Sequence, residues 1–188
     1  MSWFSSSQKS AFAPLAAATF LFNDYRTAPF WLLVRLYLGW QWLMAGWEKI
    51  TGSGWVGAGA GQAVRGFLQG ALAKASGPRP NVTSWYASFV QHVALPHAVL
   101  FSYVVTYGEL LAGVALILGI FTGLAALGGV FMNFNYLLAG TVSTNPVLLF
   151  WGLLLILAWR TAGWLGLDFW VLPLVGRTKK SKEKPSTV

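Results

Sequence analysis

Long apolar runs separated by short polar breaks dominate the sequence from Pro29 onwards. The runs lack the period-two alternation of a membrane β-barrel strand. The length of each run approaches that of a helix crossing the hydrocarbon layer, which is about 20 residues. Because only helices and closed barrels satisfy their own backbone in lipid, the pattern predicts an all-α integral membrane protein with a bundle of four transmembrane helices. The four predicted spans are residues 29–50, 98–120, 121–140 and 145–160.

The apolar segments outside these runs are too short or too interrupted to span a membrane. Residues 1–28 form an N-terminal lead in which Ala11–Phe22 is interrupted by Pro14, and we expect an interfacial helix there. The stretch GWLGLDFWVLPLVG after the fourth run is broken by Gly166, Asp168 and Pro173, so we also expect it at the interface. The membrane domain is therefore predicted to cover residues 29–175, with a basic tail at residues 176–188.

The predicted outer loop, residues 51–97, contains two short helical patterns. In AGQAVRGFLQGALAKA, from Ala60, the apolar residues recur on one helical stripe. The stripe comprises Val64, Phe67, Leu68, Ala71, Leu72 and Ala75. A second short helix is expected over residues 81–94, before Pro96. Two amphipathic helices lying over the bundle would form either a lid that shields helix ends or a substrate vestibule.

Composition and charge agree with a membrane location. Hydrophobic residues make up 56% of the chain and charged residues only 10%, against roughly a quarter charged in soluble domains. The net charge of +8 lies largely near the two ends. By the positive-inside rule both termini are expected in the cytoplasm. The partner implied by this charge is the lipid bilayer, and we expect no nucleic acid.

The chain contains no cysteine. Thiolate catalysis, disulfides, iron–sulfur ligation and zinc–thiolate sites are therefore excluded. The sequence shows no haem, flavin or metal motif, and His92 and His97 lack the carboxylate or cysteine neighbours of a metal site.

A few polar residues interrupt the spans, at Arg35, Gln41, Glu109 and Asn133. Ionisable groups within a membrane are costly, and they usually face other helices or water. We hypothesise that Arg35 and Glu109 anchor one polar pocket and that Lys49, beside Glu48, marks its outer mouth. A structural role stays open: Arg35 would pair with Glu109 or Asp168, and Glu109 would be a neutral, hydrogen-bonded carboxyl.

Several ordered motifs resemble the DoxX/DoxD family of small four-span bacterial and archaeal membrane proteins. RLYLGWQWLMAGWEKI is similar to the family's Arg…Gly…Gly-x-x-Lys pattern, and YGELLAGVALILG to its Gly-Glu…Gly…Gly pattern. MNFNYLLAGTVSTNP and WLGLD follow in order, so the resemblance covers roughly residues 30–172. The matching positions are Arg35, Gly39, Gly46, Lys49, Gly108, Glu109, Gly113 and Gly119. The resemblance implies a multi-pass protein of a bacterial or archaeal cytoplasmic membrane.

The resemblance also implies a possible activity, that of the large subunit of thiosulfate:quinone oxidoreductase, which oxidises thiosulfate and passes electrons to membrane quinone. Quinone would be the cofactor, and a second protein subunit or a homo-oligomer the expected partner. Glu109 and Arg35 are the catalytic candidates. Candidates for the quinone pocket are Tyr37, Gln41, Asn133 and Tyr136, and those for outer anion binding are Lys49, Arg65, Lys74 and Arg79. The alternative is a non-catalytic lipid- or quinone-binding structural subunit of a larger membrane complex.

Overall fold

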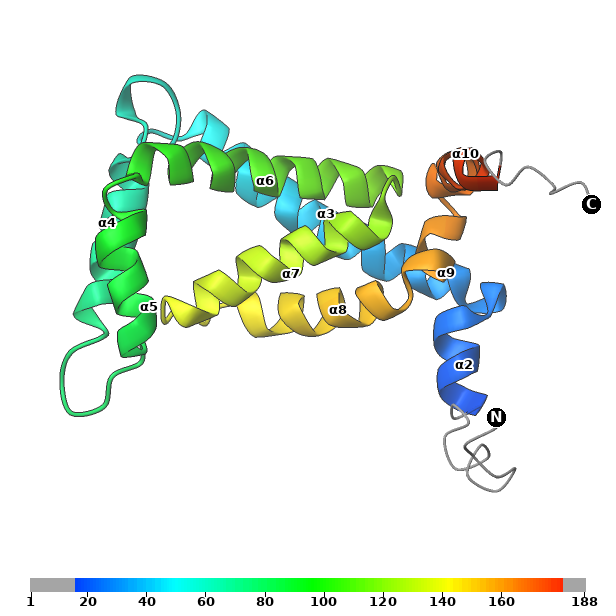
Figure 1. Ribbon diagram of the computed structural model, residues 1–188, viewed down its shortest axis with the longest axis horizontal. Helices are drawn as coiled ribbons and strands as arrows, with labels where there is room; N and C mark the ends of the chain where they lie inside the picture. Colours follow the sequence, from blue (N-terminus) through cyan, green and yellow to red (C-terminus); the bar gives the residue numbers. More distant parts are fainter. Residues whose placement is uncertain (1–15, 181–188) are drawn as a thin grey trace, which may run out of the picture.

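The computed structural model describes residues 16–180, with side chains as far as residue 174, and the regular secondary structure of this part of the chain is all helical, without strands. The longer helices are α3 (Ala28–Thr51), α6 (Ala98–Leu118), α7 (Thr122–Leu138) and α8 (Asn145–Leu157). They lie alongside one another and alternate in direction along the long axis of the molecule (Figure 1). Short helices gather at the two ends of this group.

The first and last described helices lie at the same end. Helices α2 (Ala16–Asn23), α9 (Trp159–Trp164) and α10 (Asp168–Lys180) occupy one end, and α4 (Gln62–Ala73) and α5 (Ser84–Phe89) lie across the other (Figure 1). The indole of Trp31 and the hydroxyl of Thr161 donate hydrogen bonds to carbonyls of α2. Because the first and last described helices lie at the same end, the arrangement is consistent with an even number of membrane crossings.

The long helices agree with the expected ranges within two residues, except at the end of α8. That helix ends at Leu157, and α9 begins two residues later at a change of direction. Helix α6 is long and apolar enough to cross a bilayer by itself, and α8 is equally apolar but shorter. Helix α7 has 17 residues. The crossing of the membrane by all four helices stays a prediction.

Many large apolar side chains lie on the surface and several polar ones lie inside, which is the reverse of the pattern in a soluble protein. Leu111, Leu124 and Phe131 are 67–69% exposed. Arg35, Glu109 and Asn133 are each 1% exposed. A soluble protein rarely exposes contiguous apolar surface of this kind, whereas lipid solvates it. The distribution supports a membrane protein whose polar groups face its interior.

Glycines set the close approach of α3 and α6. A Cβ added at Gly46 would lie 2.7 Å from the backbone nitrogen of Leu110, and one at Gly113 would lie 2.4 Å from that of Leu43. Small residues at such crossings are the usual surface for helix contact in membranes. Ser102, Thr106, Glu109 and Gly113 recur at helical spacing along one side of α6, and all four are buried.

The loop between α3 and α6 is folded onto the end of the long helices. Val64, Leu68 and Ala71 of α4 are buried, as their helical stripe predicted. The second helical pattern starts at Ser84 rather than Asn81, and a π-helical turn, Val90–Ala94, continues it. Tyr86 donates a hydrogen bond to the carbonyl of Asn135, which fixes α5 against α7.

The C-terminal apolar stretch forms a helix in spite of the residues that interrupt it. Helix α10 begins at Asp168 and continues through Pro173, and the location of this stretch at the membrane interface stays a prediction. An acidic residue in the first turn of a helix is favourable because of the helix dipole. Gly176, the expected start of the basic tail, lies inside α10, while residues 181–188 and residues 1–15 of the lead lie outside the described range.

Candidate functional site

The polar centre of the molecule is a three-residue cluster from three different helices. The Nζ of Lys49 lies 2.7 Å from Oε2 of Glu109. The hydroxyl of Tyr136 donates a 2.6 Å hydrogen bond to Oε1 of the same carboxylate. Within the described side chains this is the one ion pair closer than 4 Å. Both oxygens of a deeply buried carboxyl are therefore engaged.

The helices position these three side chains for identifiable reasons. Lys49 is in the last turn of α3, one turn beyond Gly46, whose contact with Leu110 brings that part of α3 against α6. Glu109 lies on the buried stripe of α6, and Tyr136 lies one turn beyond the buried Asn133 of α7. The cluster is a direct consequence of three small and polar stripes meeting.

The cluster neutralises a charge that would otherwise be costly. Removing a carboxylate from water is compensated only when a cation and further hydrogen bonds replace the water. Lys49 supplies the cation, and its own side chain is 18% exposed. Glu48, in contrast, points outward and is exposed. The ammonium of Lys49 therefore faces the interior rather than pairing with Glu48 at the surface.

Trp55 covers the outer side of the cluster. Its ring lies 4.8 Å from the Nζ of Lys49, as expected for a cation–π contact. Its carbonyl accepts a 2.5 Å hydrogen bond from Ser102 of α6. The glycine-rich loop after α3 is thereby fixed over Lys49. Sequence reasoning missed Trp55, for which the available signal was an isolated aromatic residue among glycines.

Arg35 belongs to a different part of the molecule. Its guanidinium donates to the carbonyl of Leu165 at 2.9 Å and lies between Gly119 and Gly166. Gly119 follows Glu109 by ten residues, about 15 Å along a helix. The hypothesis that Arg35 and Glu109 anchor one pocket is therefore not supported by the geometry: each is buried, but in separate surroundings.

The acid nearest to Arg35 is Asp168, one of the two partners considered from the sequence. Its carboxylate attracts the guanidinium electrostatically. Both carboxylate oxygens accept backbone hydrogen bonds at the start of α7, from Phe121 at 2.6 Å and Thr122 at 2.9 Å. Asp168 thus caps α7, and Arg35 joins α3 to the segment before α10.

The remaining pocket candidates separate into near and distant groups. Asn133 is buried one turn from Tyr136, and its amide donates to the carbonyl of Asn145 at 3.2 Å. Gln41 is half-buried, and Tyr37 is 42% exposed on the outer face of α3. Asn133 therefore lies beside the cluster, whereas Tyr37 does not.

The outer cations occupy separate elements. Lys49 is bound to Glu109, and the Nζ of Lys74 donates to the carbonyl of Gly140 at 2.9 Å. Arg65 on α4 and Arg79 in the following loop are exposed. The two arginines are thus the candidates with side chains free to meet a dissolved anion at this end.

A comparison with family models decides the relationship of the chain. The DoxX family model matches residues 30–141, a range that contains α4, α5, α6, α7 and all but the first two residues of α3. The chain belongs to the DoxX family. No curated protein and no solved structure is similar enough to match. With its inside-out side-chain distribution, this DoxX chain is a helical membrane protein.

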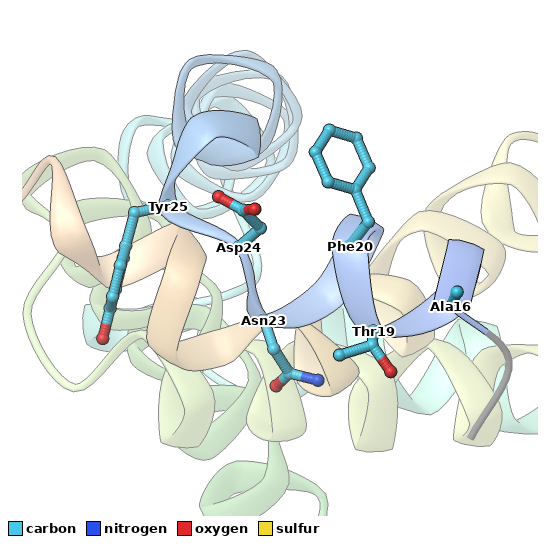
Figure 2. Close-up of a pocket in the computed structure, with 6 residues that line it drawn as sticks. All are labelled: Ala16, Thr19, Phe20, Asn23, Asp24 and Tyr25. Atoms are coloured by element: carbon cyan, nitrogen blue, oxygen red, sulfur yellow. The ribbon is translucent and has the colours of Figure 1, made fainter. Parts of the chain in front are cut away.

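Two hollows of the DoxX chain lie at the opposite end from α4 and α5, remote from the Lys49–Glu109–Tyr136 cluster. One is lined by residues of α2 and of the turn after it. Phe20 and Asp24 point to one side there, and Thr19 and Asn23 point to the other (Figure 2). The second is lined by aromatic residues of α9 and α10. Neither hollow contains residues that the sequence singled out as catalytic.

Among the described residues of the DoxX chain, no three His, Asp or Glu side chains gather as a metal site would require. The two histidines contact their own helical turns. Nδ1 of His92 lies 2.9 Å from the carbonyl of Ser88, and that of His97 lies 2.8 Å from the carbonyl of Val93.

Proposed function

We propose that this DoxX-family protein is a quinone-reactive membrane subunit of an oxidoreductase, with α3, α6, α7 and α8 crossing the bilayer. The observation that carries the proposal is the Glu109 carboxyl, 1% exposed and bonded to both Lys49 and Tyr136. An ionisable residue inside a membrane segment usually marks an ion, proton or ligand site. Its location within α6, the one described helix that is both long and apolar enough to cross a bilayer by itself, favours that role here.

The chemistry of quinone reduction matches the groups in the cluster. A quinone accepts two electrons and two protons to become a quinol, so a reactive site needs proton donors in apolar surroundings. Lys49 and Tyr136 each carry an exchangeable proton within hydrogen-bond distance of the Glu109 carboxyl. The side chain of Lys49 is 18% exposed, so it would connect the Glu109 carboxyl with the protein surface. Asn133 lies on the same face of α7, where it could orient a quinone carbonyl.

Thiosulfate is the donor that we propose to test first, because the family resemblance implies it. Two thiosulfate ions joined as tetrathionate release two electrons, which with two protons reduce one quinone. Arg65 and Arg79 are exposed at the end where the cluster opens, so they would raise the local concentration of a dianion. A second subunit would supply the site of sulfur chemistry.

A second candidate function is a structural subunit that binds lipid or quinone without catalysis. It is favoured by the completeness of the cluster, in which the protein itself bonds both oxygens of Glu109. In this role the carboxylate would join α3, α6 and α7 without taking part in chemistry.

The test is a pair of measurements on the purified full-length protein with any co-purifying subunit. Mass spectrometry of a solvent extract would detect bound quinone, and a spectroscopic assay would follow quinone reduction with thiosulfate as donor. We expect quinone at a near-stoichiometric level and reduction that depends on thiosulfate. Bound lipid without quinone, and no reduction by the complex, would favour the structural subunit.

A matched pair of carboxamide variants separates a role in catalysis from a role in folding. Glu109→Gln removes the buried charge, and Glu48→Gln removes an exposed charge of the same kind beside Lys49. We expect E109Q to fold, retain quinone and lose reduction, while E48Q retains both. Equal activity in the two variants would contradict the proposed role of Glu109.

A further inference from the structure

An aromatic hollow lies at the end of the molecule opposite the Lys49–Glu109–Tyr136 cluster. It has a volume of about 830 Å³, within the size range of small-molecule sites. Helices α9 and α10 form most of its wall, with Tyr25 completing it. We name it the α9–α10 hollow; its wall includes Tyr25, Trp159, Arg160, Trp164, Phe169 and Trp170.

The wall of the α9–α10 hollow has the composition of a membrane interface. The ring centroids of Tyr25 and Trp164 are 4.1 Å apart. Phe169 packs edge to face on Trp164, with 4.9 Å between their ring centroids. Trp170 is 69% exposed and Leu174 is 64% exposed. Tyr and Trp concentrate at the headgroup level of bilayers, where an apolar ring and a polar group are both solvated. The hollow therefore lies where headgroups are expected.

Arg160 gives this hollow a positive charge that the described residues do not neutralise. Its guanidinium lies 5.1 Å from the Trp159 ring, and within the described side chains no carboxylate oxygen lies within 4 Å of it. Asp168 also lines the hollow, but both of its oxygens accept backbone hydrogen bonds from α7. A guanidinium held against an aromatic ring remains free to bind a phosphate through two hydrogen bonds.

We propose that the α9–α10 hollow binds the phosphate headgroup of an anionic phospholipid. Arg160 would contact the phosphate, and the exposed aromatic and aliphatic side chains would contact the glycerol and upper acyl chains. Further positive charge follows along α10 at Arg177, Lys179 and Lys180, which favours an anionic over a zwitterionic lipid. The proposal is independent of the function assigned to Glu109, because the two sites lie at opposite ends.

The test is native mass spectrometry of the full-length protein in detergent, titrated with phosphatidylglycerol or phosphatidylcholine. We expect the wild type to prefer phosphatidylglycerol. Arg160→Gln should weaken phosphatidylglycerol binding about tenfold, as expected for loss of a charge-assisted contact. Phosphatidylcholine binding should weaken by less, because the choline ammonium already neutralises the phosphate of that lipid. Arg65→Gln is the matched control, since it removes an exposed arginine at the other end. Arg160→Lys keeps the charge without the bidentate geometry, and it should retain part of the preference.

Any of the following results would overturn the proposal. Unchanged phosphatidylglycerol binding in a folded R160Q variant would remove Arg160 from the site. An equal loss in R65Q would reduce the effect to overall charge. Displacement of the lipid by inorganic phosphate at millimolar concentration would identify a site for a dissolved anion instead. If R160Q does not fold, as judged by circular dichroism and gel filtration, R160K decides: binding no stronger than that of phosphatidylcholine would also overturn it.

Discussion

The contact between Gly46 and Leu110 yields a sharp prediction, because it determines how closely α3 approaches α6 beside the cluster. In the variant Gly46→Ala, the new Cβ would lie 2.7 Å from the Leu110 nitrogen and 3.0 Å from its Cα. An ordinary contact begins at 3.4 Å, so the helices would have to separate by about 0.7 Å. Because the opposing atoms are backbone, a change of side-chain rotamer cannot relieve the clash.

The expected cost follows from two opposing effects. Overpacking typically destabilises a protein by about 1–3 kcal/mol, and alanine in place of a helical glycine restores up to about 1 kcal/mol. The net loss is about 1–2 kcal/mol. At about 2–4 °C per kcal/mol for a chain of this size, the melting temperature should fall by several degrees. The separation should also loosen the Lys49–Glu109 pair three residues further along α3.

The assay is thermal unfolding of the detergent-purified protein, followed by tryptophan fluorescence. Gly128→Ala is the control, because Gly128 lies on the exposed side of α7 and an added Cβ there would meet no atom within 4 Å. G128A should melt at or above the wild-type temperature. If G46A melts at the same temperature as G128A, the close α3–α6 contact and the positioning of Lys49 that rests on it are both wrong.

Three further predictions test other contacts. Lys49→Met should destabilise the protein by less than the about 3–5 kcal/mol typical of breaking a fully buried pair, since Lys49 is 18% exposed; Lys49→Arg should restore most of this in the same melting assay. Asp168→Ala removes the acceptor of two amides at the start of α7, and it should cost about 0.5–2 kcal/mol, more than Asp168→Asn does. Burial raises the pKa of Tyr86 above its ordinary value of 10.0, so the folded state holds a proton that the unfolded chain loses. Melting temperature should therefore fall as the pH rises above 10, and Tyr86→Phe should flatten that part of the profile.

Helix positions and buried faces were accessible from the sequence because both follow from one period. The stripe from Ser102 to Gly113 combines small and polar residues at helical spacing, and such a stripe has few alternatives to an interior location. The same reasoning identified the buried face of α4 from Val64, Leu68 and Ala71. Helical spacing alone is sufficient to predict a buried face where all the small, polar or apolar residues of that face recur at this spacing.

The end of α8 was not accessible in this way, because no residue near Ala158 signals a break. The apolar run continues from α8 into α9 without proline or glycine at the junction. Long-range contacts mark the boundary instead: Ala158 and Ala162 are both fully buried, and Thr161 donates to the carbonyl of Phe22 in α2. The docking of α2, over a hundred residues earlier, is not visible in the local pattern.

The partner of Glu109 in the candidate site also depends on a long-range contact that the local sequence pattern does not reveal. The sequence identified Glu109, Lys49 and Arg35 individually, but a helical pattern defines only a direction around each axis and a position along it. The pairing was decided by where α3 crosses α6, and that crossing depends on Gly46 and Gly113, which admit the backbone of the other helix. Lys49, one turn after Gly46, consequently reaches Glu109, whereas Arg35 lies near Gly119 at the far end of α6. The two cations of α3 thus bind at separate places: Lys49 pairs with the carboxyl for which we propose a role in quinone chemistry, and Arg35 joins α3 to the segment that precedes α10.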